Sequence, residues 1–303
     1  MPSHKLPQCW GHRGASAEFP ENTLPSFAKA IRDGADAIES DVHISADDVV
    51  LMFHDPSLQR TTNGSGYITK QPWYGPDGMQ HLKTLKEPSQ HIPTFDETIT
   101  LLMKPENRHV RLNVDVRVEN DPVRLFKSMQ EILEKHTAWE TDLAPRLIIG
   151  LWHTCFIRPA REMLGHCPII HLGVSTQLAR DYFWDTCNMF SMNFALLASA
   201  DGQRFIHECQ AAGKWIGVWT LNTPEEMCEA VRWQVDAILT DVPHVWFQLR
   251  ADLDADFNKT ITKHGRLFLW TKWHYYFPCV ASWALFAKFY LQHFIGPLEC
   301  LSS

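Results

Sequence analysis

The order of apolar and helical segments in this sequence predicts a TIM-type (β/α)8 barrel. Short apolar runs alternate with amphipathic helical patterns from residue 8 to residue 243, as a parallel α/β sheet requires. The strand-like runs number eight, which is the number that closes such a barrel. They lie at residues 8–12, 36–43, 111–117, 147–152, 169–174, 190–195, 215–220 and 237–240.

Helix start signals stand between these runs. Each is a capping residue, with a proline or a glutamate after it, followed by apolar residues at helical spacing. They are Asn22-Thr23, Thr94 with Glu97, Asp121-Pro122 and Thr223 with Glu226. The first predicted helix ends at Gly34, where a helix commonly stops. Helices in these positions can connect parallel strands.

A ninth apolar run, at residues 49–54, follows the second strand after the short turn 45–48. Parallel strands need a long crossover, whereas antiparallel strands need only a few residues. We therefore predict a hairpin that folds back on the second strand and brings His54 near Asp41. The polar stretch 56–93 is then a long loop over the same rim, and long ordered loops usually serve an active site.

Composition excludes several classes of protein. The chain is 45% hydrophobic and 21% charged, which excludes a disordered protein. Its net charge of −7 and its scattered basic residues argue against a nucleic-acid groove. Eight cysteines without a CxxC pair predict reduced, mostly buried thiols; they are Cys9, Cys155, Cys167, Cys187, Cys209, Cys228, Cys279 and Cys300. The first residues lack the apolar core of a signal peptide, so we expect a reducing, cytosolic location for the body.

Three carboxylates stand at the predicted carboxyl ends of neighbouring strands, where barrels carry their working residues. Glu39 and Asp41 are two apart on one strand and so share a face, and Asp115 is at the corresponding height on the next strand. Three converging carboxylates repel one another unless a cation joins them. Oxygen ligands favour Mg²⁺ or Ca²⁺ over zinc, so we predict a site for one of these ions. An E-x-D pair alone would more often be a solvated strand end or part of a salt bridge.

Two histidines and two arginines belong to the same rim. His12 and His54 are candidates for general acid and general base, because imidazole can take and give a proton near neutral pH. Among sixteen histidines any single one is more often structural, and these two are selected by their neighbours. Arg13 and Arg117 supply guanidinium groups, which suit the oxygens of a phosphodiester.

These residues resemble the glycerophosphodiester phosphodiesterase family over about residues 8–245. The matching motifs, in the family's order, are His12-Arg13-Gly14, Pro20-Glu21-Asn22-Thr23, Glu39-x-Asp41, His54-Asp55, Arg60-Thr61-Thr62-Asn63-Gly64, Ile92-Pro93-Thr94, Val218-Trp219-Thr220-Leu221-Asn222 and Leu239-Thr240-Asp241-x-Pro243. The resemblance implies a TIM barrel of the phospholipase C-like phosphodiesterase type and a divalent cation on the three carboxylates. It also implies acid and base roles for the two histidines and a substrate pocket shaped by Arg13, Glu21 and Trp219.

The sequence departs from the family at one functional position. Where the family commonly has Glu-x-Lys, this chain has Asp115-x-Arg117. Aspartate is a shorter carboxylate but still a metal ligand, and arginine keeps the positive charge. Activity is therefore expected, with a pocket geometry that differs from the family's.

Residues 267–296 differ in composition from the predicted barrel, being rich in Trp, Tyr and Phe. Such residues concentrate at membrane interfaces. Lys272 and Lys288 bracket about fifteen uncharged residues, fewer than the roughly twenty that a spanning helix needs. We expect an interfacial helix or a shallow hairpin turning at Pro278, and the alternative is a helix packed onto the barrel or a second subunit. The predicted division is a barrel at 7–250 and a linker with an aromatic membrane-anchoring tail at 251–303.

A membrane tail indicates a substrate that is still in the bilayer. The chain looks like the phosphatidylglycerol-specific phospholipase C branch of the family, which also carries a Gly150-Leu151-Trp152 type of strand and an aromatic anchor. That implies diacylglycerol and glycerol 3-phosphate as products. We expect the enzyme on the cytosolic face of an intracellular membrane, such as the endoplasmic reticulum, the mitochondrion or a lipid droplet. The alternatives are a phosphodiesterase for soluble or lyso substrates and a catalytically silent barrel that binds lipid.

Overall fold

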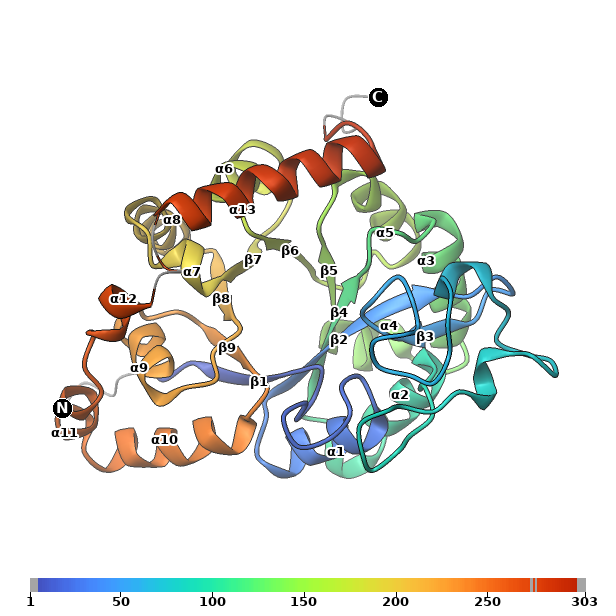
Figure 1. The fold of residues 1–303 in the computed structure, drawn as a ribbon, viewed down its shortest axis with the longest axis horizontal. Helices are drawn as coiled ribbons and strands as arrows, with labels where there is room; N and C mark the ends of the chain where they lie inside the picture. Colours follow the sequence, from blue (N-terminus) through green and yellow to red (C-terminus); the bar gives the residue numbers. More distant parts are fainter. Residues whose placement is uncertain (1–4, 273–274, 276, 299–303) are drawn as a thin grey trace.

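Eight parallel strands close into a barrel, which confirms the predicted fold (Figure 1). The computed structural model describes residues 5–272, 275 and 277–298. Hydrogen bonds between neighbours run in the order β1-β9-β8-β7-β6-β5-β4-β2, and pairing of β1 with β2 closes the ring. The parallel strands are β1 (Gln8–His12), β2 (Ala37–Ile44), β4 (Arg111–Val116), β5 (Leu147–Leu151), β6 (Ile169–Gly173), β7 (Met189–Asn193), β8 (Trp215–Trp219) and β9 (Ala237–Thr240).

The ninth run forms β3 (Val50–Met52), which pairs antiparallel with β2. The predicted hairpin is therefore confirmed. The bounds of β7 differ most from the prediction of 190–195. This strand stops at Asn193 because the Asn193 side chain accepts hydrogen bonds from the backbone N–H groups of Ala195 and Leu196 and so caps the next helix.

Helices surround the barrel, as Figure 1 shows. They are α1 (Leu24–Arg32), α2 (Phe95–Leu102), α3 (Pro122–Leu133), α4 (Trp139–Asp142), α5 (Ile157–Met163), α6 (Thr176–Leu178), α7 (Phe194–Leu197), α8 (Ala200–Ala211), α9 (Pro224–Arg232), α10 (Pro243–Ala255), α11 (Phe257–Lys263), α12 (Phe268–Thr271) and α13 (Phe277–Tyr290). Thr23, Thr94, Asp121 and Thr223 cap helices as predicted. Asn22 does not cap α1, since its side chain is directed to the barrel mouth.

The barrel interior is filled by a small apolar cluster that includes Trp10, Ala37, Ile148 and Leu239. The larger core lies between the strands and the surrounding helices. Side chains alternate between the two faces of a strand. Residues two and four positions further along a strand than a member of this cluster therefore also point into the barrel. They lie above the cluster, towards the carboxyl ends of the strands. This alternation places polar side chains of β1, β2 and β4 over a closed apolar floor.

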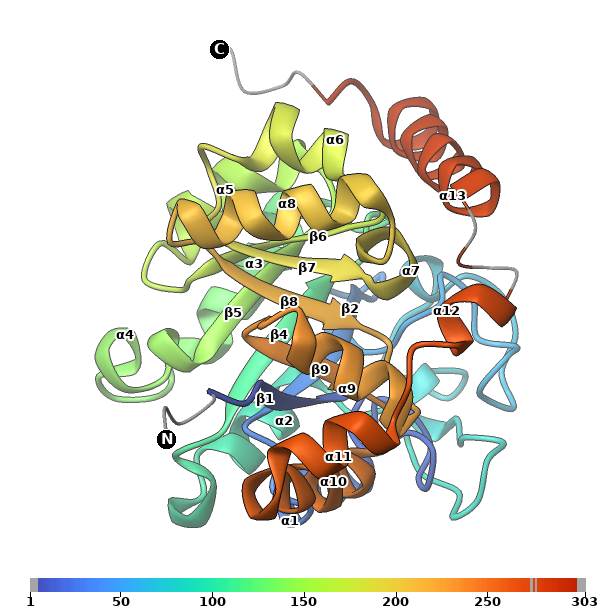
Figure 2. The same cartoon turned by 90° about the vertical axis from the view of Figure 1, so that its left-hand side faces the viewer.

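The C-terminal segment runs along the outside of the barrel and then over one side of its carboxyl-end rim, beside β5, β6 and β7 (Figure 1). Figure 2 shows α13 beyond the carboxyl ends of the strands. No helix among the described residues is both long and apolar enough to cross a membrane. The predicted turn at Pro278 is not formed, because α13 continues through this residue, and proline is well accommodated in the first turn of a helix. Of the seven cysteines in the described residues, five are buried, as predicted, namely Cys9, Cys167, Cys187, Cys209 and Cys228, and Cys300 lies outside these residues.

Candidate active site

The three predicted carboxylates meet at the mouth of the barrel. Oxygen atoms of Glu39, Asp41 and Asp115 all lie within 4.8 Å of one another, and all three residues are buried. Strand register produces this meeting, because Asp41 and Asp115 are paired across β2 and β4. Glu39 stands one pleat lower on the same face of β2 and reaches upward with its longer side chain.

Each carboxylate is held by one neutral donor. The backbone N–H of Arg13 donates to Glu39 Oε2 at 3.0 Å. Asn22 Nδ2 donates to Asp41 Oδ2 at 2.9 Å, and Trp152 Nε1 donates to Asp115 Oδ1 at 2.7 Å. A carboxylate can accept about four hydrogen bonds, so lone pairs of the three groups stay available for a ligand.

Two arginines partly offset this negative charge. Arg13 Nε lies 3.4 Å from Asp41 Oδ2, and one terminal nitrogen of Arg117 lies 3.5 Å from Asp41 Oδ1 and 3.4 Å from Asp115 Oδ2. These distances exceed the 2.7–2.9 Å of a strong charge-assisted hydrogen bond. The guanidinium groups therefore remain able to bind an anion that enters the mouth.

The pKa values of the carboxyl groups show how strongly they repel one another. Burial, together with the charge of Asp41, raises the pKa of Glu39 to about 8. Burial also raises the pKa of Asp115 to about 6. Burial would raise the pKa of Asp41 too, but the nearby His54, Arg13 and Arg117 outweigh it and lower this pKa well below its usual range. The group is therefore short of positive charge, as the site of a divalent cation would be.

The chemistry of the donors fits a hard cation. All three ligand candidates offer oxygen, which Mg²⁺ and Ca²⁺ prefer. The buried amide of Asn113 also lines this mouth and has no hydrogen-bond partner among the described residues. Such an amide is normally satisfied, so its oxygen and nitrogen are available to a polar ligand that enters this pocket.

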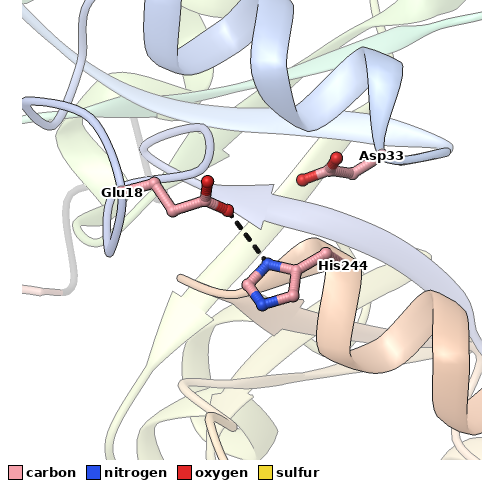
Figure 3. A group of neighbouring side chains, drawn as sticks. All are labelled: Glu18, Asp33 and His244. Atoms are coloured by element: carbon pink, nitrogen blue, oxygen red, sulfur yellow. Dashed lines mark ion pairs between the residues drawn. The ribbon is translucent and has the colours of Figure 1, made fainter.

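A second group of acidic and imidazole side chains does not fit a cation as well. Glu18, Asp33 and His244 gather on the outer surface near α1 and α10 (Figure 3). The ammonium of Lys29 already lies 2.6 Å from Asp33 and 3.1 Å from Glu18, and His244 pairs with Glu18 at 3.0 Å. This group is a surface ion-pair network that carries its own positive charge.

The two predicted histidines lie at the end of β1 and just after β3, the hairpin strand on the neighbouring β2, and each is oriented by a carboxylate. His12 Nδ1 lies 2.7 Å from Asp241 Oδ1, and His54 Nδ1 lies 2.6 Å from Asp55 Oδ1. Burial alone would lower the pKa of His12, but Asp241 and Glu39 raise it above its ordinary value. Burial and the two arginines lower the pKa of His54, against the effect of Asp41. The pKa of His12 is thus raised and the pKa of His54 is lowered.

Glu21 contacts the arginines of the site and is not itself part of the pocket wall. Its Oε1 accepts from Arg13 at 2.9 Å and from Arg60 at 2.6 Å. Arg60 also pairs with Asp55, which orients His54. Arg60 belongs to the 56–93 loop, and this loop therefore reaches the active-site rim as predicted.

A pocket of about 160 Å³ brings most of the predicted residues together. Its lining contains His12, Arg13, Glu39, Asp41, His54, Asp115, Arg117 and Trp219, while Glu21 acts from behind Arg13. Sequence reasoning gave no role in the site to Asn113, Trp152 and Asp241, and it assigned Asn22 only to a helix cap. Three of them lie within motifs that were noticed, but the partner that each would contact could not be read from the motif.

Comparison with known proteins finds a matching family and several relatives. The model of the glycerophosphoryl diester phosphodiesterase family matches residues 12–245. A glycerophosphodiester phosphodiesterase of Caldanaerobacter subterraneus is 25% identical over 252 residues, which cover 78% of this chain and 95% of the relative. Glycerophosphodiester phosphodiesterase 1 of Mus musculus is 34% identical over 94 residues, or 29% of this chain and 28% of that protein. A phosphodiesterase of Oleispira antarctica, solved in complex with the product sn-glycerol-3-phosphate, has a TM-score of 0.67 and 22% identity, covering 82% of this chain and 97% of its own.

Proposed function

The chain belongs to the glycerophosphoryl diester phosphodiesterase family and is a phosphoric diester hydrolase, and we propose that it cleaves phosphatidylglycerol into diacylglycerol and glycerol 3-phosphate. The observation that carries the chemistry is the convergence of three buried carboxylates, two oriented imidazoles and two arginines on one pocket. Cationic groups beside imidazoles that can donate and accept protons suit the cleavage of a phosphodiester, which needs both charge neutralisation and proton transfer.

The family's divalent metal would be held by Glu39, Asp41 and Asp115, and we propose Mg²⁺ or Ca²⁺. When bound, such a cation neutralises phosphate oxygens and lowers the cost of the charge that builds on them. Arg13 and Arg117 add positive charge from the protein side, and both line the pocket. Arginine's planar fork matches two phosphate oxygens at once.

The histidines supply the proton transfers. We expect the 2-hydroxyl of the headgroup glycerol to attack phosphorus, with one imidazole accepting its proton. The other imidazole gives a proton to the diacylglycerol oxygen as its bond to phosphorus breaks. Water then opens the cyclic phosphate and leaves glycerol 3-phosphate. A headgroup without that hydroxyl, such as choline, cannot follow this route and should react poorly.

Two observations support a lipid substrate over a soluble one. Among the described residues, six of the eleven exposed large apolar side chains lie in residues 267–289, on α12, α13 and just before them. An exposed apolar patch of this kind is typical of a membrane or partner surface. We therefore propose that residues 267–296 hold the enzyme on the cytosolic face of an intracellular membrane. The second observation is an apolar cavity beside the catalytic pocket.

Mass analysis of the products from mixed lipid vesicles tests the proposal. Vesicles should contain phosphatidylglycerol and phosphatidylcholine, with lysophosphatidylcholine and glycerophosphocholine supplied in the same assay. We expect diacylglycerol and glycerol 3-phosphate, formed from phosphatidylglycerol alone, and no product from the His12→Ala variant.

The other outcomes identify the alternatives. Preferential cleavage of glycerophosphocholine or the lyso lipid would replace phosphatidylglycerol with a soluble or single-chain substrate. Binding to vesicles without any product, under each divalent cation tried, would indicate a lipid-binding barrel and contradict an enzymatic role.

A further inference from the structure

An apolar cavity of about 270 Å³ lies between the barrel mouth and α13. On the barrel side its wall comes from the end of β6 and the loop and helix that follow, including Leu172, Val174 and Leu178. On the other side it is closed by α13, through Trp283, Phe286 and Ala287. Figure 2 shows α13 beyond the carboxyl ends of the strands, on the side of β6 and β7. Almost the whole lining is apolar, so the cavity suits a hydrocarbon and not a headgroup.

The cavity adjoins the catalytic pocket. Arg117, Trp152, Leu172 and Trp219 line both spaces. The indole rings of Trp152 and Trp219 meet edge to face with centroids 5.9 Å apart. Their N–H groups are turned to polar partners in the barrel, Asp115 and the backbone oxygen of Ser191. The apolar parts of the rings are thus left to form the boundary between the two spaces.

Helix α13 is fastened to the barrel on both sides of this cavity. Beyond its C-terminal end the backbone oxygens of Gly296 and Leu298 are hydrogen-bonded by His153 and Thr154, which follow β5. Tyr290 donates to Glu119 in the loop after β4. Ahead of α13, Tyr275 donates to Glu226 at 2.6 Å. The helix is therefore a built wall of the cavity and not a detached anchor.

We propose that this cavity binds one hydrocarbon chain of the diester substrate while the phosphate occupies the catalytic pocket. The inference rests on the proposed function and adds to it that α13 contributes directly to substrate binding. Arg117 stands at the junction, so a phosphate held there points its lipid substituent past Trp152 and Trp219 into the apolar space. The exposed outer side chains of α13, such as Leu285 and Phe289, then face the lipid surface from which the chain comes.

The proposal predicts a dependence on chain length. Each methylene that enters an apolar site contributes about 0.8 kcal/mol, a change of roughly fourfold in affinity. Affinity for simple alkyl phosphates should therefore rise steeply from butyl to octyl and then level off once the cavity is full. Calorimetric titration of the cation-loaded protein measures this without any need for hydrolysis.

Blocking variants test the site from both walls. Ala287→Trp fills the cavity from α13, and Val174→Trp fills it from the barrel, so that misfolding of one leaves the other informative. Val123→Trp is the matched control, because it adds the same side chain to a helix, α3, at a position that is 50% exposed and lies outside both the cavity lining and residues 267–296. The assay compares kcat/KM for long-chain phosphatidylglycerol in detergent micelles with kcat/KM for glycerophosphoglycerol, which has no chains.

We expect each blocking variant to lower the ratio of the two kcat/KM values by at least about tenfold and to remove the chain-length dependence of alkyl phosphate binding. The control should keep both. Blocking variants with the native ratio, or a native protein that binds butyl and octyl phosphate equally, would overturn the proposal and indicate that the cavity serves another occupant, such as a second protein chain.

The two proposals fail separately. If the native protein does not cleave phosphatidylglycerol but binds longer alkyl phosphates more tightly, and Ala287→Trp removes this preference, the proposed headgroup is wrong and the chain site stands. If phosphatidylglycerol is cleaved and the blocking variants behave as the native protein, the function stands and the chain site is wrong.

Discussion

Replacing Glu39 by glutamine should stabilise the metal-free protein while removing its cation. The carboxylate of Glu39 lies within 4.8 Å of both neighbouring carboxylates. At that distance each like-charge pair costs ~3.5 kcal/mol at an effective dielectric constant of ~20. Glutamine removes the charge and can still accept the hydrogen bond from the backbone N–H of Arg13. Attraction to the arginines is lost as well, so we expect a net gain of about 2–4 kcal/mol in the free energy of unfolding.

The gain should depend on pH. Burial and Asp41 raise the pKa of Glu39 from 4.5 to about 8 in the folded protein. Between these two values the native state binds a proton that the unfolded state has released, so the stability of the native protein falls as pH rises, by at most about 1.4 kcal/mol per unit. The Glu39→Gln variant lacks this group. The two proteins should be equally stable near pH 4.5 and differ most near pH 8.

Urea unfolding in the presence of a chelator, followed over this pH range, measures the difference. Glu21→Gln is the opposite control, because arginines lower the pKa of Glu21 and its loss should destabilise the protein at neutral pH. Adding Mg²⁺ or Ca²⁺ at a hundred times its Kd should stabilise the native protein by about 2.7 kcal/mol and leave the variant unchanged. A Glu39→Gln variant that is less stable than the native protein throughout, in chelator, would refute the reasoning.

Four further predictions concern catalysis. His12→Ala and His54→Ala should each reduce kcat by about 10²–10⁴, with cation binding by calorimetry retained, whereas a loss under tenfold would exclude acid or base roles. Chelation should abolish turnover and added Mg²⁺ or Ca²⁺ should restore it, and turnover that persists in chelator would contradict a metal requirement. Asp241→Asn should lower the pKa of His12, so that a pH limb of kcat/KM moves to lower pH, and an unmoved profile would show that Asp241 does not tune this ring. Arg117→Lys should lower kcat/KM about tenfold, because one guanidinium nitrogen contacts both Asp41 and Asp115, and a faster variant would show that arginine is a handicap here.

The fold and the acidic group could be predicted because both depend on short-range periodicity. Short apolar runs that alternate with helical patterns located all eight strands, and the spacing of Glu39 and Asp41 placed them on one face. The position of Asp115 beside Asp41 followed from aligning the carboxyl ends of the two predicted strands. Such features require only the geometry of a strand and the rule that parallel strands present their carboxyl ends together.

The partners of these residues could not be predicted, because they come from distant parts of the chain. Asp241 is 229 positions from His12, and Trp152 is 37 positions from Asp115. Asp241 and Trp152 both belong to motifs in the sequence. Whether such a side chain holds a ligand or only lines the pocket depends on its orientation in the folded protein, which a motif does not show.

The position of α13 was outside the reach of sequence for a different reason. Its residues are apolar around most of the helix, so no amphipathic stripe indicates which face would pack on the barrel. Composition alone suggested an anchor, and packing of a helix onto the barrel was the alternative. In the structure the helix packs over one side of the barrel rim and also leaves apolar side chains exposed, so one element can serve both purposes.

Anomalous diffraction from crystals grown with Mn²⁺, a substitute for the native cation, tests the central claim most directly. The account predicts one strong peak bound by oxygens of Glu39, Asp41 and Asp115, lost in the Glu39→Gln variant. A barrel mouth with no peak under saturating Mn²⁺, or a peak confined to the surface group of Glu18, Asp33 and His244, would contradict it.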